Sequence, residues 1–270
     1  SYAELDAASA AFAHRLRTVR GGAVFVHLPR SVAFYVALLA TWKAHKTYVP
    51  LDPTLPAERL AYMIEVVTRG VGPSTLLTDG GLPGYTGDTL SLQELIAGAA
   101  ACAEASAAAP PAAPPLAAPA TILFTSGSTG KPKGVQISHR AIASVLLSWR
   151  SMLPTTRASR LLQLASPGFD VSLGEVCLPL ASGFAVATAP RQELLTDLEL
   201  ALHRLGVTVA MLPAALASVV RPEHAPPLAW LLSGGDVIDD RVLHTWGAVP
   251  GRLINAYGPT EATIGNTLGF

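Results

Sequence analysis

Charged residues are scarce in this chain of 270 residues, where Asp, Glu, Lys and Arg together make up 14% of the sequence. The 19 basic and 19 acidic side chains cancel at neutral pH, and the isoelectric point is near 7.0. A chain without net positive charge has no general electrostatic attraction for nucleic acid or for an anionic membrane. We therefore expect neither as a partner and look for partners at individual sites.

Cysteine is scarce as well, with Cys102 and Cys177 far apart in the sequence. Two such residues suggest neither a disulfide framework nor a metal cluster, so reduced cytoplasm is the expected location. The chain also lacks the run of about 18 apolar residues that a membrane-spanning helix needs, and a signal sequence at its start. Ser1 falls inside a helix-like pattern, which leads us to expect a longer parent polypeptide.

Hydrophobic residues, in contrast, make up 50% of the sequence, enough for a sizeable core. Short apolar runs bounded by turn residues alternate with segments of helical periodicity, a pattern typical of a mostly parallel sheet in an α/β fold. The expected strands are 23–28, 48–51, 74–78, 122–124, 135–137, 161–165, 185–188, 207–212, 230–232 and 253–256. The expected helices are 7–16, 32–42, 57–67, 140–153, 173–180, 197–205 and 240–246.

A stretch rich in alanine and proline, residues 97–120, interrupts this alternation. Its two pairs of adjacent prolines disfavour a helix, so we expect a surface connection there. We accordingly divide the chain into a first α/β half at 1–98, the connection at 99–120 and a second α/β half at 121–270. An interdomain linker is the alternative, but the next strand carries the loop described below, which favours one α/β body.

The most informative stretch is the loop Thr125-Ser126-Gly127-Ser128-Thr129-Gly130-Lys131-Pro132-Lys133-Gly134, which lies between two expected strands. Its three glycines permit positive φ and close backbone approach, and its hydroxyls and lysines suit a polyphosphate. It is not a Walker P-loop, because Pro132 follows Lys131 where that motif has Ser or Thr. A polar hairpin turn with solvated lysines is the alternative interpretation.

Residues 122–134 strongly resemble the nucleotide-loop motif of the adenylate-forming enzymes, which include acyl-CoA synthetases, firefly luciferase and the adenylation domains of nonribosomal peptide synthetases. Four other segments resemble, in order, core motifs of the peptide-synthetase branch. They are Ser1-Tyr2-Ala3-Glu4-Leu5, Tyr48-Val49-Pro50-Leu51-Asp52-Pro53, Phe169-Asp170-Val171-Ser172 with Glu175, and Asn255-Ala256-Tyr257-Gly258-Pro259-Thr260-Glu261. The resemblance implies layered sheets flanked by helices, as in the N-terminal subdomain of such an adenylation domain, here incomplete.

The resemblance also implies an activity, in which an amino acid and ATP with Mg²⁺ give aminoacyl-AMP and pyrophosphate. Lys131 would bind the β- and γ-phosphates, Thr260 would contact the α-phosphate, and Glu261 would hold Mg²⁺. Further nucleotide-binding residues would be Thr125, Ser126, Gly127, Ser128, Thr129, Gly130, Gly234, Gly235, Asn255 and Tyr257, the last stacking on adenine. A solvated Thr-Glu pair, and a tyrosine that simply packs under its turn, are the alternatives.

Asp170 is the residue that bears most on the substrate. By resemblance it would pair with the α-ammonium group of an amino acid, a group that fatty and aryl acids lack. The same residue precedes an expected helix, so a role as the helix N-cap is the alternative. A buried carboxylate needs a partner, and this favours the ligand role.

The residues that match the family's side-chain pocket carry no charge apart from Asp170. They are Asp170, Val171, Gly174, Met211, Leu232, Gly234, Ala256, Ile264 and Gly265. Apolar walls and small residues suit a bulky, mostly apolar side chain, with an aromatic amino acid preferred. A long cationic side chain that reaches solvent or Asp236 is left open.

Ligands of open α/β sheets bind at the carboxyl ends of strands. The loop at 125–134 and the segments 169–170, 233–236 and 257–261 all follow expected strands, so we expect the four to converge at one sheet edge.

The family's later motifs, including a C-terminal subdomain with a Lys that bridges substrate and nucleotide, do not occur. That subdomain and the phosphopantetheine thiol of a peptidyl carrier protein are the implied partners, and we expect the chain alone to be poorly active. An acyl- or aryl-CoA ligase and a non-catalytic nucleotide-binding module are the rival functions.

Overall fold

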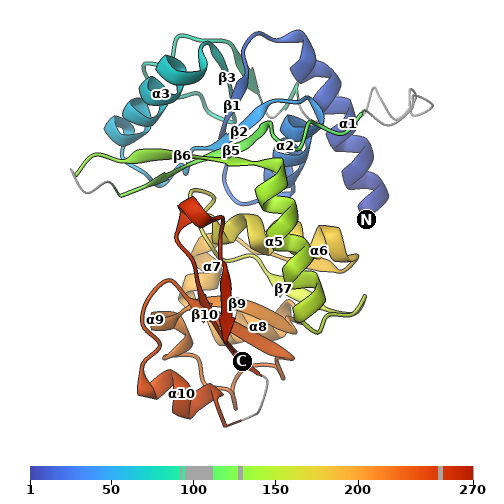
Figure 1. Ribbon diagram of the computed structural model, residues 1–270, viewed down its shortest axis with the longest axis vertical. Helices are drawn as coiled ribbons and strands as arrows, with labels where there is room; N and C mark the ends of the chain where they lie inside the picture. The colour runs from blue at the N-terminus through green and yellow to red at the C-terminus, as the bar shows by residue number, and fades with distance from the viewer. Residues whose placement is uncertain (92, 95–111, 127–129, 249–251, 270) are drawn as a thin grey trace. The chain divides into compact units, whose positions relative to one another are not determined.

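The structure is a computed structural model that describes residues 1–91, 93–94, 112–126, 130–248 and 252–269. The chain forms two compact units, Ser1–Arg140 and Ala141–Phe270. Each unit contains one six-stranded sheet flanked by helices (Figure 1). The predicted α/β fold is confirmed. Among the helices in the described ranges, none combines the length and hydropathy that crossing a membrane would require.

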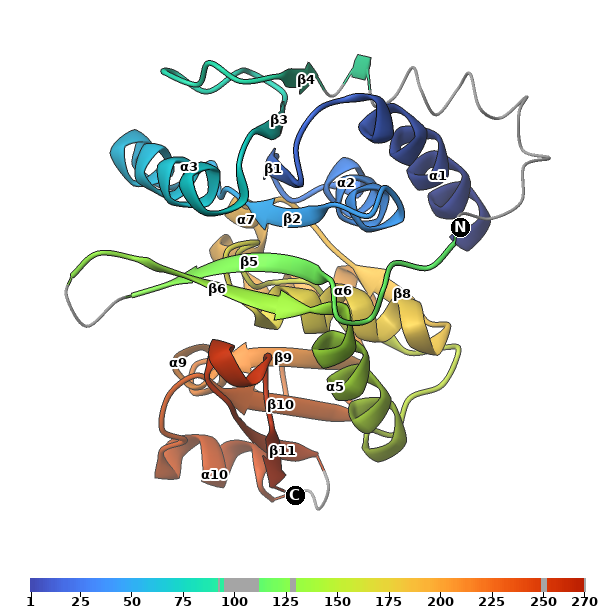
Figure 2. The ribbon, with the colours of Figure 1, turned by 45° about the horizontal axis from the view of Figure 1, so that its top comes forward.

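The first sheet has the strand order β4-β3-β1-β2-β5-β6, and β5–β6 is its one antiparallel pair (Figure 2). Its strands are β1 (Ala23–His27), β2 (Thr47–Pro50), β3 (Ser74–Thr78), β4 (Thr89–Ser91), β5 (Pro119–Thr125) and β6 (Lys133–Ser138). The helices of this unit are α1 (Tyr2–Thr18), α2 (Val32–Lys43) and α3 (Ala57–Val71). Helix α2 is the crossover between the parallel neighbours β1 and β2, and α3 carries the chain from β2 past β1 to β3.

Strand β2 shows how this sheet is covered on its two faces. Val49 belongs to a core cluster that includes Leu60 and Met63 of α3. The preceding residue, Tyr48, points to the opposite face, as successive strand residues do. Its ring lies against Phe34 of α2, with the ring centroids 6.2 Å apart. Helix α3 therefore covers one face of the sheet and α2 the other.

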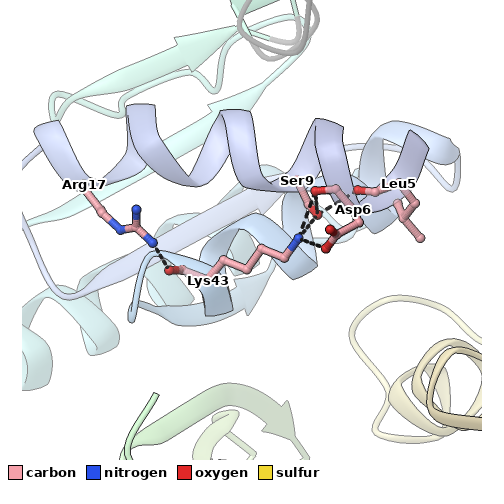
Figure 3. A network of polar contacts seen from close by, with 5 residues as sticks. All are labelled: Leu5, Asp6, Ser9, Arg17 and Lys43. Atoms are coloured by element: carbon pink, nitrogen blue, oxygen red, sulfur yellow. Dashed lines mark hydrogen bonds and ion pairs between the residues drawn. The ribbon is translucent and has the colours of Figure 1, made fainter. Parts of the chain in front are cut away.

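Lys43 ties the last turn of α2 to the first half of α1 (Figure 3). Its Nζ donates to the carbonyl of Asp6 at 2.9 Å and to Oγ of Ser9 at 2.8 Å, and it pairs with the Asp6 carboxylate. In the same network, Arg17 donates to the Lys43 carbonyl at 2.6 Å. These contacts add polar bonds to the apolar packing of α1, where Phe12 is fully buried.

The second sheet has the order β12-β11-β10-β9-β7-β8, and β11–β12 is its one antiparallel pair. Its strands are β7 (Arg160–Leu162), β8 (Ala185–Ala187), β9 (Val209–Pro213), β10 (Trp230–Gly234), β11 (Leu253–Tyr257) and β12 (Thr267–Gly269). The helices are α5 (His139–Met152), which begins at the end of the first unit, α6 (Val171–Ser182), α7 (Arg191–Thr196), α8 (Leu198–Arg204), α9 (Ala214–Ala217), α10 (Asp240–Trp246) and the 3₁₀ turn η1 (Thr260–Ala262).

Successive side chains of β9 point to opposite faces of this second sheet. Leu212 packs in a core cluster with Leu202 of α8 and Trp246 of α10. Met211 points to the other face, where its register partner on β10 is Leu232. Both side chains are nearly fully buried. The second face of the sheet carries the candidate site.

The hairpin β5–β6 belongs to the first sheet, which differs from the division expected from sequence. Strand β5 pairs with β2, and the Trp42 indole donates to the Ala120 carbonyl at 2.8 Å. The compact units consequently divide after Arg140 rather than within 99–120, and much of that stretch lies outside the described residues.

The expectation that all four loops share one sheet edge is wrong. The loop at 125–134 joins strands of the first sheet, whereas the segments after β7, β10 and β11 border the second. Most other predicted elements occur within a few residues of their expected bounds, and α10 has the predicted bounds. Helices α7 and α9 and strands β4 and β12 were not predicted, because elements this short leave no clear periodicity.

Candidate functional site

The phosphate loop predicted from sequence is held at the end of an antiparallel hairpin, where Thr125 pairs with Lys133. Oγ1 of Thr125 is buried and has no hydrogen-bond partner among the described residues. Lys131 is exposed, and Gly130 adopts a φ of +80°, a left-handed conformation that favours glycine. Gly127, Ser128 and Thr129 lie outside the described residues, and Ser126 is exposed. The described part of the loop presents an exposed cation and a buried hydroxyl that a ligand oxygen would satisfy.

Asp170 lies at the N-terminus of α6 and is only 8% exposed. It occupies the N-cap position, but its side chain makes no capping hydrogen bond. Burial raises the pKa of its carboxyl, a hydrogen bond from Thr260 opposes that rise, and the charge of Glu261 adds to it. The buried carboxylate also accepts hydrogen bonds from the backbone of Val171 and of Asp170 itself. A cation would add the opposite charge that these bonds do not supply.

Asp170, Thr260 and Glu261 come together although about ninety residues separate the first from the other two. Thr260 begins the 3₁₀ turn η1 directly after β11, and Glu261 is the next residue of that turn and is exposed. The structure thus joins the residue predicted for a substrate ammonium group to the two predicted for the α-phosphate and Mg²⁺.

A cavity of about 580 Å³ opens on the second face of the second sheet. Its lining includes eight of the nine residues predicted to contact the substrate, namely Asp170, Val171, Met211, Leu232, Gly234, Ala256, Ile264 and Gly265. Their binding role stays a prediction. The ninth, Gly174, is buried but does not line the cavity.

Sequence reasoning did not identify several residues of the cavity wall. Trp149 comes from α5, and Arg191 and Leu195 come from α7. The cavity is also lined by residues that follow β7, including Ser166, and by residues that follow β9. Trp149 carried no signal of a site in the sequence, since a tryptophan on a helix usually packs in the core.

Glu175 is a fully buried carboxylate that fixes the cavity wall after β7. It accepts backbone N–H groups from Leu164 at 3.1 Å and from Ala165 at 2.9 Å, and the side-chain amide of Gln163 at 3.2 Å. Each of these bonds gives a partner to a buried polar group that would otherwise lack one. Because Leu164 and Ala165 line the cavity, Glu175 acts as a positioning residue for that wall.

Three of the predicted nucleotide-binding residues, Gly235, Asn255 and Tyr257, are exposed. Gly235, with a φ of +80°, lines the cavity and is exposed, while Tyr257 and Asn255 are exposed and do not line it. Tyr257 is 70% exposed, so its ring does not pack beneath its own turn. An exposed aromatic face suits stacking on a planar base.

The turn that follows η1 is conformationally unusual. Thr263 has a φ of +66° and Ile264 a φ of +65°, although a β-branched residue seldom adopts such values. Such a conformation costs free energy of about 1–3 kcal/mol per residue and is often found at functional sites. Here it holds the side chain of Ile264, 5% exposed, in the cavity wall.

Cys177 and His139 lie in surroundings that indicate a structural role. Cys177 is buried within α6, which raises its pKa to about 12. Burial lowers the pKa of His139, and its ring contacts the edge of Trp42 with centroids 5.5 Å apart. Neither group has the setting of a catalytic nucleophile or base.

The chemistry of these groups fits ATP and Mg²⁺. The loop offers a cation and the buried hydroxyl of Thr125 for phosphate oxygens. Glu261 offers an exposed carboxylate, the oxygen ligand that Mg²⁺ prefers alongside phosphate. The described residues contain no cluster of three or more His, Cys, Asp or Glu suited to an all-protein metal site, and Mg²⁺ bound through phosphates needs none.

The chain belongs to the AMP-binding enzyme family, whose sequence pattern matches residues 1–269. It is 51% identical over 270 residues to the ferrichrome siderophore peptide synthetase of Mycosarcoma maydis. The aligned region is 100% of this chain and only 6% of that protein. The chain therefore spans a small fraction of the length of this curated relative.

Two solved structures share the fold. The N-terminal subdomain of Klebsiella oxytoca NpsA, in complex with 3-hydroxybenzoyl-AMSN, matches with a TM-score of 0.83 and 27% identity, covering 99% of this chain and 67% of that one. The four-domain nonribosomal peptide synthetase AB3403, bound to AMP and glycine, matches with a TM-score of 0.81 and 29% identity, covering 100% of this chain and 20% of that one. The resemblance to the N-terminal subdomain of an adenylation domain is confirmed.

Proposed function

We propose that this chain is the part of a nonribosomal peptide synthetase adenylation domain that binds ATP and an amino acid. The buried carboxylate of Asp170 at the wall of an otherwise mostly apolar cavity is the observation that carries this proposal. A buried carboxylate favours a cationic partner, and the α-ammonium group of an amino acid supplies one. The relatives from peptide synthetases support the same reaction.

The residues of the chain supply positioning and charge stabilisation rather than a covalent nucleophile. Lys131 and the loop hydroxyls bind the β- and γ-phosphates, and Gly127, Ser128, Thr129 and Gly130 are the other loop residues that we propose for this role. Glu261 would hold Mg²⁺, which would supply neutralising charge for the departing pyrophosphate. Thr260, adjacent to Asp170, directs its hydroxyl to the α-phosphate once the substrate ammonium has taken its place at the carboxylate.

The substrate we propose is an amino acid with a large and mostly apolar side chain, preferably aromatic. The walls from Val171, Met211, Leu232 and Ile264 are apolar and support this class. Arg191 and Asp236 also line the cavity, so a side chain with a polar end has two charged groups within the same space.

After activation, we propose that the aminoacyl group passes to the phosphopantetheine thiol of a peptidyl carrier protein. A C-terminal subdomain that supplies the closing lid is the further partner that we propose. The relative from Mycosarcoma maydis is named as a siderophore peptide synthetase, so assembly of a peptide siderophore is the pathway class that we propose.

An aryl-acid ligase is the second candidate, because the NpsA subdomain was solved with a 3-hydroxybenzoyl compound. Such an acid has no ammonium group and would leave Asp170 without its ion-pair partner. The Asp170→Ala variant separates the two functions. It should abolish activation of an amino acid and spare that of an amine-free acid.

The deciding experiment is ATP–pyrophosphate exchange across the amino acids and several aryl acids. It is run on this chain and on the longest natural polypeptide that contains it. Exchange by the longer form with one amino acid supports the proposal, and strong exchange by the isolated chain contradicts the need for a further subdomain. If neither form shows exchange with any acid, the proposed catalytic function is overturned.

A further inference from the structure

The indole of Trp149 fills the space beside two glycines that the sequence assigned to the substrate pocket. A Cβ built on Gly174 would lie 3.0 Å from Cζ3 of Trp149, and one built on Gly265 would lie 3.1 Å from Cζ2. The benzene ring of the indole therefore lies close to both residues. One belongs to α6 and the other to the turn after η1.

The position of Gly174 supports this description. It is the one predicted substrate residue that does not line the cavity, whereas Trp149 does. Trp149 itself is only 2% exposed, so its ring is packed against its neighbours rather than projecting freely into solvent. The missing side chains of Gly174 and Gly265 thus make room for a protein side chain.

We infer that Trp149 is a specificity-determining residue, whose indole forms the wall that limits the size of the substrate side chain. The inference rests on the proposed function, because it concerns the amino-acid end of the same cavity. Because a methyl group at either glycine would come within 3.0 or 3.1 Å of the ring, the indole has little room to withdraw toward α6 or toward the turn. The wall is consequently rigid, and its position depends on residues 149, 174 and 265 together.

Shortening this side chain should move the preference toward larger substrates. We expect Trp149→Phe, and more strongly Trp149→Ala, to raise kcat/KM for the largest apolar amino acids relative to alanine and valine by at least about tenfold. Gly174→Ala should have the opposite sign, because its methyl group pushes the indole into the cavity. In the Trp149→Ala background the same glycine substitution should have little further effect.

The test measures exchange with alanine, valine, leucine, phenylalanine and tryptophan, using the longest natural polypeptide that contains the chain. Trp246→Phe is the matched control. This tryptophan is also buried, at 3% exposure, but packs in the core on the other face of the sheet and donates to the Ala217 carbonyl. It should lower stability and leave the substrate profile unchanged.

A folded, active Trp149→Phe variant with an unchanged profile would overturn the inference. If the wild type shows no exchange with any acid, the result counts against the proposed function. A second measurement then tests whether Trp149 forms the cavity wall. Indole should raise the melting temperature of Trp149→Ala but not that of the wild type, because the deletion leaves an apolar space of its shape. No such shift would overturn the inference that the indole occupies an apolar space of its own shape at this wall.

Discussion

Gly234 approaches the carbonyl of Ala256 so closely that a Cβ built on the glycine would lie 2.2 Å from that oxygen. The two residues are register partners on the parallel strands β10 and β11. The pairing of these strands therefore requires glycine at this position, whatever the cavity holds. A residue that sequence analysis assigned to ligand binding has an independent structural role.

We predict that Gly234→Ala destabilises the protein by about 1–3 kcal/mol, because the strands must separate to admit the methyl group. Chemical denaturation measures the loss. Gly269→Ala is the control, since its Cβ would meet only Asn255 at ordinary distances of 3.8 and 3.9 Å. Equal stability of Gly234→Ala and the wild type would show that β10 and β11 can separate without cost.

Asp170→Asn should stabilise the ligand-free protein at neutral pH. Burial raises the folded-state pKa of this carboxyl above its ordinary value of 3.8, so the ionised form opposes folding at every pH above both values. That cost declines as the pH falls through the folded pKa, and it vanishes below the unfolded pKa. The melting temperatures of variant and wild type, compared from pH 7 to pH 3, should therefore converge on acidification.

The same substitution should weaken amino-acid binding by about 30-fold to several thousand-fold, as expected when one partner of a buried ion pair is lost. Asp236→Asn, which changes an exposed carboxylate of the same cavity, serves as the stability control and should shift the melting temperature little. A loss of stability in Asp170→Asn at pH 7 would contradict the account of this residue.

Glu175→Gln should destabilise the protein by about 2–3 kcal/mol. The substitution replaces one acceptor oxygen by an NH₂ group that faces the N–H donors of Leu164 and Ala165. Urea denaturation measures the effect. Glu65→Gln removes a carboxylate from an exposed pair with Arg69 and should cost less than about 1 kcal/mol. Matching losses in the two variants would argue against a positioning role for Glu175.

Lys43→Met should cost about 1 kcal/mol, since it keeps the apolar stem and deletes the hydrogen bonds to Asp6 and Ser9 (Figure 3). Local opening of α1 is the expected consequence, and amide hydrogen exchange in α1 measures it. Arg69→Met on the surface of α3 should leave exchange in α1 unchanged. Unaltered protection of α1 in Lys43→Met would show that apolar packing alone holds the helix.

Much of the fold and of the residue set could be predicted from the sequence. The period of the apolar residues identified the longer helices and strands, and α10 was located with its observed bounds. Ordered motifs around Thr125, Asp170 and Glu261 identified the family, because the chemistry of nucleotide binding constrains residue type and spacing over short stretches. These features are local, so one sequence is sufficient to reveal them.

Tertiary structure decided how these local elements combine. The hairpin β5–β6 belongs to the first sheet because β5 pairs with β2. The periodicity of the apolar residues does not predict which strands pair. The glycines at 174 and 265 looked like space for a substrate, yet Trp149, distant in sequence, fills the space beside them. Contacts between distant residues depend on which surfaces meet in the folded chain. The sequence alone therefore determined the family, and packing determined the shape of the cavity.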